Sequence, residues 1–334
     1  MKKVWIALAG ILLSSSLQAA NLKLVRDYIT VESIASLADM GAYTIAGRTG
    51  TAEERSYFIE VYKSDSLEMV RSIPLPHRPS TFDIQDDCKL MTFGAMSVSH
   101  VDICAGRVTK TIPFGGNRVA HGSISVNQNL YLISEPNEGL IAIGNNVRPI
   151  RIGKHISPLF SMSKDNQGIW VTSYNNLWKV DVARQTKTPV FESGGLYGYT
   201  HQLHLDNKRM ALSVYDDKAL VLYNKSTQTV DTHVDLQWHP GAITSFGSCL
   251  AVARPHEKEV VIFAGSDRGK LFAVTSYDLN DAGDKLKLPE YISFSEATGT
   301  LFVKSAYPCP TCSVTQSSLF ALQLAGDDLP AECF

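Results

Sequence analysis

The sequence lacks the pattern of an amphipathic helix. Beyond the first 20 residues, no segment places apolar side chains at helical spacing over several turns. Long hydrophobic runs are also missing, because Val4–Leu13 is an apolar stretch of only ten residues and too short to span a bilayer. These absences argue against a helical fold and against a transmembrane segment in the mature chain.

Familiar catalytic motifs are absent as well. The chain contains no G-x-S-x-G elbow, P-loop, dinucleotide-binding fingerprint or H-E-x-x-H motif. An excess of positive charge is missing too, since 31 Lys and Arg residues stand against 33 Asp and Glu. Without a basic face or a polybasic run, the chain is not expected to bind nucleic acid or an anionic membrane surface.

The N-terminus has the organisation of a secretory signal. Lys2 and Lys3 precede the apolar stretch, and small and polar residues follow it. We predict a signal peptide over residues 1–20, cleaved after Ala19 or Ala20. Loss of its two lysines leaves 29 basic residues against 33 acidic ones, a net charge of −4. The mature chain is expected to be periplasmic or secreted.

Histidines recur ahead of short apolar β runs at a nearly constant phase. From His77 to His121 is 44 residues, from His121 to His201 is 80, and from His201 to His239 is 38, with His155 inside the double step. A period near forty residues built only from short strands is typical of a β-propeller. We therefore predict that residues 21–334 form a single all-β domain with a C-terminal tail.

The strand pattern predicts seven blades of four strands each. The first repeat is expected to begin with a strand at Val31–Ala35. The last repeat supplies only three strands, and Leu22–Ile29 is an apolar strand left over ahead of the first repeat. We predict that this N-terminal strand becomes the outer strand of the seventh blade and closes the ring, which removes a loose sheet edge.

Six cysteines in an exported chain suggest disulfides. In the second repeat, a predicted hairpin turning near Met96 places Cys88 and Cys104 at equal distances from the turn, so we expect them to face each other and bond. Cys249 lies at the first turn of the sixth repeat, where the C-terminal tail is expected to pass. A Cys249–Cys333 bond would hold the chain end in place.

The remaining cysteines form the sequence Cys309-Pro-Thr-Cys312. We predict that it lies in a loop of the seventh blade, on the opposite face from Cys249. Such a pair can be a local Cys309–Cys312 disulfide, a redox couple or half of a metal site. A redox couple of the thioredoxin kind needs a helix start within an α/β fold, and the flanking prolines do not favour one at Cys309.

The recurring histidines are candidates for a binding site. In a propeller they would meet at one rim, where the outer strand of one blade leads into the inner strand of the next. Imidazole is a common ligand of zinc and copper, so converging histidines could hold either metal. A structural role remains open, because histidine at this position can join neighbouring blades by hydrogen bonds. The candidate rim and channel residues are His77, His121, His155, His201, His239, Tyr199, Arg118 and Arg254, and the candidate metal ligands are His121, His201, His239, Cys309 and Cys312.

One turn has a recognisable propeller motif. Asp165-Asn166-Gln167-Gly168-Ile169-Trp170 looks like the D-x-x-G-x-hydrophobic-W turn of several propeller families, with one residue fewer before the tryptophan. The aspartate is expected to cap the turn, the glycine to adopt a positive φ, and Trp170 to enter the blade core.

Across about residues 22–324, the repeat pattern resembles the YVTN/WD40-like family of bacterial periplasmic seven-bladed propellers. That family includes protein-interaction scaffolds, lactone-hydrolysing enzymes, subunits of quinone-dependent amine dehydrogenases and periplasmic metal chaperones. The resemblance therefore leaves several functions open, and our first hypothesis is a monomeric, non-enzymatic binding protein whose rim takes a periplasmic protein, a small ligand or a metal ion. The alternative is a hydrolase of lactone type with a histidine base at the channel mouth.

Overall fold

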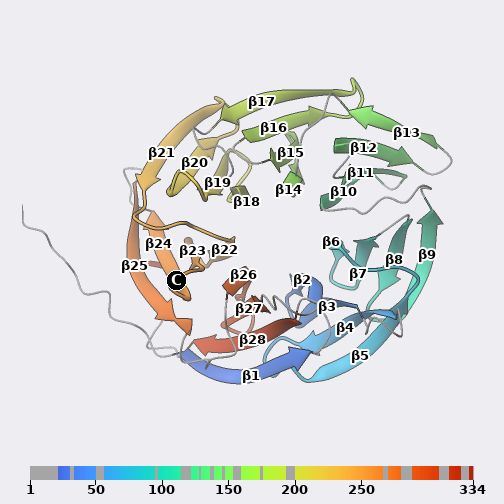
Figure 1. The fold of residues 1–334 in the computed structure, drawn as a ribbon, viewed down its shortest axis with the longest axis horizontal. Helices are drawn as coiled ribbons and strands as arrows, with labels where there is room; N and C mark the ends of the chain where they lie inside the picture. Colours follow the sequence, from blue (N-terminus) through green and yellow to red (C-terminus); the bar gives the residue numbers. More distant parts are fainter. Residues whose placement is uncertain are drawn as a thin grey trace, which may run out of the picture.

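The protein is a closed ring of seven antiparallel sheets with four strands each (Figure 1). It is seen in a computed structural model, which describes residues 22–30, 34–49, 56–94, 97–113, 122–127, 129–135, 139–144, 147–152, 159–173, 176–192, 200–265, 270–279, 288–307, 316–324 and 331–333. We call the sheets blades 1 to 7, and their strands A to D from the centre outward. The A strands of neighbouring blades contact each other in an unbroken cycle that includes β26 of blade 7 and β2 of blade 1.

The first three blades follow one another along the chain. Blade 1 contains β2 (Ile34–Met40), β3 (Tyr43–Thr49), β4 (Tyr57–Lys63) and β5 (Met69–Leu75). Blade 2 contains β6 (Thr81–Asp86), β7 (Lys89–Phe93), β8 (Ser97–Asp102) and β9 (Arg107–Pro113). Blade 3 contains β10 (Gly122–Asn127), β11 (Leu130–Glu135), β12 (Gly139–Gly144) and β13 (Val147–Ile152).

The other blades complete the ring. Blade 4 contains β14 (Leu159–Asp165), β15 (Gly168–Ser173), β16 (Asn176–Asp181) and β17 (Thr186–Glu192). Blade 5 contains β18 (Thr200–His204), β19 (Arg209–Val214), β20 (Ala219–Asn224) and β21 (Thr229–Asp235). Blade 6 contains β22 (Ile243–Phe246), β23 (Cys249–Arg254), β24 (Glu259–Gly265) and β25 (Leu271–Asp278). Blade 7 contains β26 (Leu288–Ser295), β27 (Thr300–Tyr307), β28 (Gln316–Leu324) and β1 (Leu22–Thr30) in that order, and Ala331–Cys333 forms a short 3₁₀ helix.

The hydrophobic core lies between the blades. Alternate side chains of a strand point to opposite faces of its sheet, so each B and C strand can pack against two neighbours. Met91 and Phe93 of blade 2, for example, share a buried cluster with Tyr131 and Ile133 of blade 3. Among the described residues, no helix is long and apolar enough to cross a membrane.

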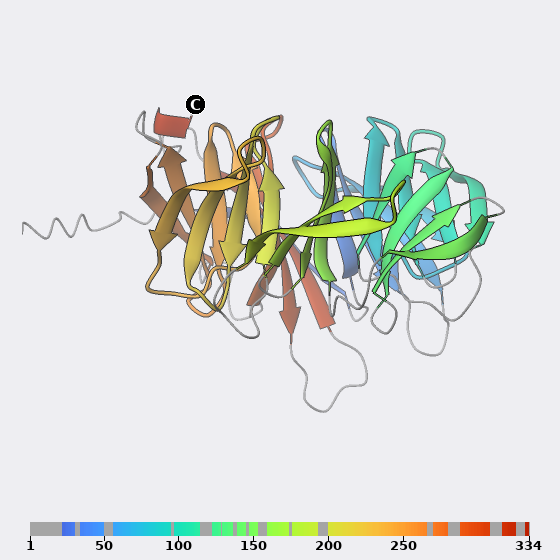
Figure 2. The same ribbon diagram turned by 90° about the horizontal axis from the view of Figure 1, so that it is seen from above.

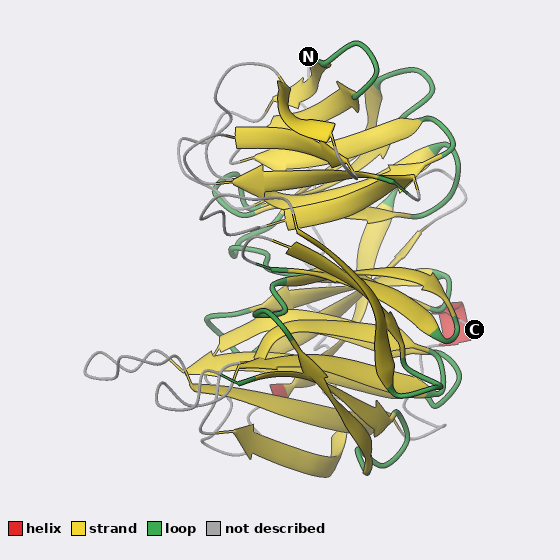
Figure 3. Ribbon diagram, turned by 90° about the vertical axis from the view of Figure 1, so that its right-hand side faces the viewer, coloured by secondary structure: helices red, strands yellow, loops and turns green. Residues whose placement is uncertain are grey.

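The strands run through the thickness of the ring, so their turns lie on two opposite rims (Figures 2 and 3). One rim carries the A–B and C–D turns, including the turns that contain Cys88 and Cys104, and we call it the cysteine rim. The opposite rim carries the B–C turns and the D–A connections, including the connections that contain His77 and His239, and we call it the histidine rim.

The strand pattern of the sequence agrees with the structure to within a few residues, with one larger difference. Strand A of blade 1 covers Ile34–Met40 and not the predicted Val31–Ala35. Met40 pairs with Tyr43 across a two-residue turn in which Gly41 has a φ of 71°. Because glycine adopts this left-handed conformation without a steric penalty, the strand can continue to Met40 and reverse there.

Both disulfides predicted in the described part of the chain are present. The Cα atoms of Cys88 and Cys104 lie 5.3 Å apart, and those of Cys249 and Cys333 lie 5.2 Å apart. The predicted register of the blade 2 hairpin was wrong by one residue, because the amide of Ile103 donates to the carbonyl of Cys88. Cys104 therefore reaches Cys88 from the C–D turn and not from a paired position on strand C.

The Asp165 turn has the structure that its sequence predicts. One carboxylate oxygen of Asp165 accepts hydrogen bonds from the amides of Gln167 and Gly168 and from the Trp170 indole, which is fully buried. Gly168 has a φ of 146°. The second oxygen binds the ammonium of Lys225, which comes from the C–D turn of blade 5 and is also fully buried. The turn therefore ties blade 4 to blade 5, a role that the motif alone does not reveal.

Candidate functional site

Four of the predicted rim residues are described: His77, His201, His239 and Arg254. The others lie outside the described residues, namely His121, His155, Tyr199, Arg118, Cys309 and Cys312. The Cys309–Cys312 bond and the proposed zinc or copper set that includes those cysteines therefore stay predictions. Among the described residues alone, no group of three or more His, Cys, Asp or Glu side chains could hold a metal ion.

His77 is part of the packing between strands. It is 4% exposed, its Nδ1 lies 3.1 Å from the carbonyl oxygen of Arg78, and its Nε2 lies 3.0 Å from the hydroxyl of Ser99. Since a carbonyl only accepts, Nδ1 donates and the neutral ring can accept the Ser99 proton at Nε2. Burial lowers the pKa of His77, which favours this neutral form. The side chain thus fixes the D–A connection to strand C of blade 2.

His201 lies on an inner strand, opposite Ser213 of β19. Burial lowers the pKa of His201 to about 4, so the imidazole is neutral at physiological pH. A neutral imidazole can be a metal ligand or a hydrogen-bonding group. Among the described residues, His201 does not belong to any group of three or more side chains that could hold a metal ion.

His239 is held on the histidine rim by Tyr215. The two rings are stacked with centroids 4.5 Å apart and planes 24° from parallel. The Nδ1 of His239 donates to the carbonyl oxygen of Tyr215 over 2.9 Å. The stack and the hydrogen bond together set the orientation of an imidazole that remains partly exposed.

A second imidazole joins this arrangement from the next blade. His256, in the B–C turn of blade 6, is exposed, and its Nε2 lies 2.8 Å from the hydroxyl of Tyr215. The rings of His239 and His256 approach edge to face, with centroids 6.2 Å apart. His256 follows strand B and does not share the phase of the other histidines, so the repeat pattern does not point to it.

Arg254, at the end of β23 in blade 6, forms ion pairs within its own blade. Its guanidinium contacts the carboxylates of Glu257 and Glu259 at 3.1 and 2.9 Å and lies over the Trp238 ring at 5.6 Å from the centroid. The two acidic groups offset its charge. Arg254 is therefore a poor candidate for binding an anion and a better one for positioning Trp238.

These side chains lie at the junction of two blades in two contacting groups, Tyr215 with His239 and His256, and Trp238 with Arg254. We call the five residues together the blade 5–6 cluster. Its members come from two B–C turns, one D–A connection and the end of β23, which are anchored by the buried strands below. Tyr, Trp and Arg are the residue types that most often dominate binding energy at protein interfaces. The cluster offers aromatic faces and imidazole nitrogens in fixed positions at the molecular surface.

Comparison with known proteins identifies the fold of the chain but neither a family nor a function. No protein-family model and no curated protein matches the chain. Among solved structures, the WD40 repeats of RRP9 share 10% sequence identity at a TM-score of 0.67, covering 91% of this chain and 100% of that one. U3-55K shares 11% identity at a TM-score of 0.66 and covers 91% of this chain and 99% of its own. Hydrazine synthase of Kuenenia stuttgartiensis shares 13% identity at a TM-score of 0.58, covering 83% of this chain and 94% of that one. The chain is a seven-bladed propeller that resembles WD40-repeat structures.

Proposed function

We propose that the protein is an exported, non-enzymatic binding propeller of the bacterial periplasm, similar to the YVTN/WD40-like group, that binds a protein partner on its histidine rim. The blade 5–6 cluster carries this proposal. Its aromatic side chains are held in place before binding by the Tyr215–His239 stack and by the hydrogen bond between Tyr215 and His256. Contacts that are ordered in advance lose less conformational entropy when a partner binds.

Export is supported by the cysteines and by the start of the chain. Disulfides form and persist mainly in oxidising compartments, and the two bonds of the cysteine rim fit such a location. Cleavage after residue 20 would leave β1 intact, and the pairing of β1 with β28 supports the proposal that the mature N-terminus closes blade 7.

Intact-mass measurement on protein from the periplasm tests both export and the position of cleavage. A mature chain that begins within or beyond β1, or one that retains residues 1–20, would contradict them.

Site-specific photo-crosslinking tests the binding surface. Lys218 and Ser226 are both exposed residues of blade 5, but Lys218 shares the B–C turn with Tyr215 on the histidine rim, whereas Ser226 lies in the C–D turn on the cysteine rim. A photoreactive residue at position 218 should form an adduct of defined mass with a periplasmic protein, and one at position 226 should not. Equal adducts from both positions would reject the assignment.

A cluster variant then tests whether the adduct depends on the proposed contacts. His239→Ala removes the stacked imidazole and should weaken binding of the identified partner by about thirtyfold or more, the lower range for a residue that dominates an interface. An unchanged thermal unfolding temperature would separate this loss from misfolding. Unchanged affinity in a folded variant would show that the cluster is not the binding surface.

The metal-chaperone and hydrolase hypotheses predict different results. A chaperone that uses His121, His201 and His239 would carry stoichiometric zinc or copper when isolated from the periplasm, and His201→Ala would lose it. A hydrolase would act on a panel of lactones and esters with a pH profile governed by a group near neutral pH. Metal content and turnover on that panel therefore distinguish all three functions.

A further inference from the structure

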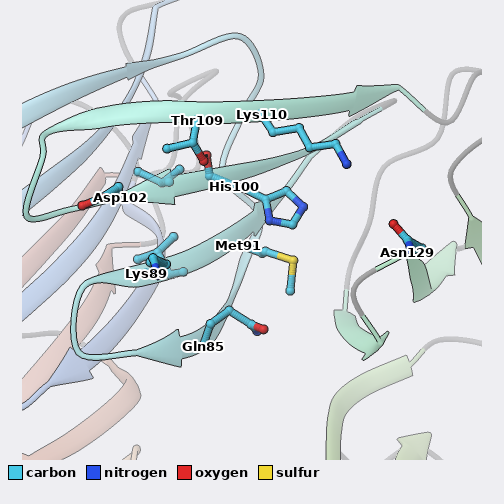
Figure 4. A pocket seen from close by; sticks show the side chains of 10 residues that line it. Gln85, Lys89, Met91, His100, Asp102, Thr109, Lys110 and Asn129 are labelled. Carbon is cyan, nitrogen blue, oxygen red and sulfur yellow. The ribbon is translucent and has the colours of Figure 1, made fainter.

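A cleft separate from the histidine rim lies between blades 2 and 3. Its volume is about 370 Å³, and most of its lining comes from strands B, C and D of blade 2. Figure 4 shows the side chains of Gln85, Met91, His100 and Lys110 extending toward Asn129, which belongs to the A–B turn of blade 3. The cleft is therefore walled by two blades that a shared hydrophobic cluster holds together.

The charge in this cleft is mainly positive and incompletely neutralised. Lys110 is exposed and has no ion pair or hydrogen bond among the described residues. Lys89, in contrast, lies 3.4 Å from Asp86. The single acidic side chain of the lining, Asp102, accepts a hydrogen bond from the amide of Ala105 at 2.7 Å and points away from Lys110 (Figure 4). The ammonium of Lys110 thus has no counter-ion in the described structure.

An oriented imidazole lies beside that ammonium. The Nε2 of His100 lies 3.0 Å from the hydroxyl of Tyr131 in blade 3, and this contact fixes the ring across the blade interface. The Nδ1 has no hydrogen-bond partner among the described residues. Burial, and secondarily the charge of Lys110, lower the pKa of His100. The neutral ring can carry its proton on Nδ1 and donate it to a ligand while Nε2 accepts from Tyr131.

The floor of the cleft is apolar. Met91 is 1% exposed and lines its base on the side of blade 3, whereas the side chains of Leu90 and Val101 pack on the opposite face of the sheet, against blade 1. A methionine side chain is flexible and polarisable, so it can fit an aromatic or aliphatic group of varying shape. An apolar floor with a few polar groups and an unpaired cation at its edge is a typical arrangement for a small ligand that carries one charged group.

We propose that this cleft binds a small organic oxyanion, with the anionic group between Lys110 and His100 and the apolar part against Met91. A phosphate or carboxylate would form a charge-assisted hydrogen bond with the ammonium and accept the Nδ1 proton of His100. The amide groups of Gln85 and Asn129 lie on the same walls and can contact further oxygen atoms. This site is independent of the binding surface on the histidine rim.

Methionine methyl NMR tests the proposal with three probes. Phenyl phosphate carries both the anion and an apolar ring, inorganic phosphate carries the anion alone, and phenol carries the ring alone. Phenyl phosphate should shift the Met91 methyl signal in a saturable way, inorganic phosphate should bind more weakly, and the signal of the fully buried Met210 of blade 5 should not move. Phenol binding as tightly as phenyl phosphate, or no saturable shift at Met91, would overturn the proposal.

Two variants of equal charge change provide the control. Lys110 and Arg107 are both exposed residues of β9, but only Lys110 lines the cleft. Lys110→Gln should weaken phenyl phosphate binding roughly tenfold, which corresponds to the loss of one hydrogen bond to a charged group. Arg107→Gln should leave the affinity within about twofold, a small change in the general field of the protein. Equal weakening by both variants would show nonspecific attraction and refute the site.

Discussion

The buried contact between Asp165 and Lys225 should contribute more to stability than the exposed ion pairs of the described residues. The side chain of Lys225 is 0% exposed and that of Asp165 is 12% exposed. The ammonium also donates to the carbonyl oxygen of Asp206 over 2.7 Å. Lys225→Met keeps the approximate length of the side chain but removes the buried ammonium that contacts the carboxylate of Asp165. Removing one partner of a buried pair costs about 3–5 kcal/mol, so we expect a loss near 3 kcal/mol because Asp165 keeps three other hydrogen bonds.

Thermal unfolding measures the effect directly. At about 2 °C per kcal/mol for a chain of this size, Lys225→Met should lower the unfolding temperature by roughly 6 °C. The control is Arg209→Gln, which breaks the pair of Arg209 with Asp206, whose side chains are 54% and 39% exposed. Exposed pairs contribute about 1 kcal/mol or less, so this variant should lose about 2 °C at most. Equal losses in the two variants would refute the argument from burial.

The pH dependence provides a second test of the same pair. Burial would raise the pKa of Asp165, but the hydrogen bonds from Lys225, Trp170 and the Gln167 amide outweigh it and hold the pKa below its usual value. A carboxyl group whose pKa is lowered on folding stabilises the fold above its unfolded pKa, and this contribution is lost as the pH falls through the folded pKa. The stability deficit of Lys225→Met should therefore shrink in acid. A deficit that grows in acid would contradict the assignment.

Three further predictions concern other parts of the ring. The double variant Cys88→Ser, Cys104→Ser opens a cross-link with a sequence separation of 16 and should lose about 3 kcal/mol, measured as a drop in unfolding temperature without reducing agent. A reducing agent should lower the unfolding temperature of the native chain further, because it also opens the Cys249–Cys333 bond. Gly94→Ala would place a Cβ 2.2 Å from both the His77 Nδ1 and the Arg78 carbonyl oxygen, so it should cost about 1–3 kcal/mol, whereas alanine at Gly265, which has open space, should cost less than 1 kcal/mol. Burial raises the pKa of Asp39 to about 6, and one of its carboxylate oxygens is buried with no partner among the described residues. The neutral form is then favoured by folding, so Asp39 costs stability as the pH rises from about 4 through 6, and Asp39→Asn should raise the unfolding temperature at pH 7.5 but not at pH 4. An equal rise at both pH values would reject the pKa argument for Asp39.

Local patterns in the sequence were sufficient to predict the blades, because each strand is marked by its own turn residues and by the alternation of its side chains. The Asp165 turn is an example of a structure that a local pattern predicts. Its capping aspartate, its glycine and its buried tryptophan all follow from six consecutive residues. Lys225 is sixty residues away and belongs to a different blade, so no local pattern connects it to Asp165. Contacts between blades depend on the register and placement of whole sheets, which a single sequence does not encode in any short segment.

The position of a histidine in its repeat likewise does not predict its environment in the fold. His77 and His239 occupy the same position in their repeats, yet their surroundings assign them different roles. His77 is buried because Gly94 leaves room for its ring and Ser99 supplies a hydrogen-bond partner on strand C. His239 is partly exposed, and the stacked ring and the backbone carbonyl of Tyr215 hold it on the rim. The repeat determines where a histidine is placed, and the neighbouring residues determine whether its ring is buried between strands or partly exposed on the rim. A search for function in this protein should therefore start from residues outside the repeat phase, such as Tyr215 and His256.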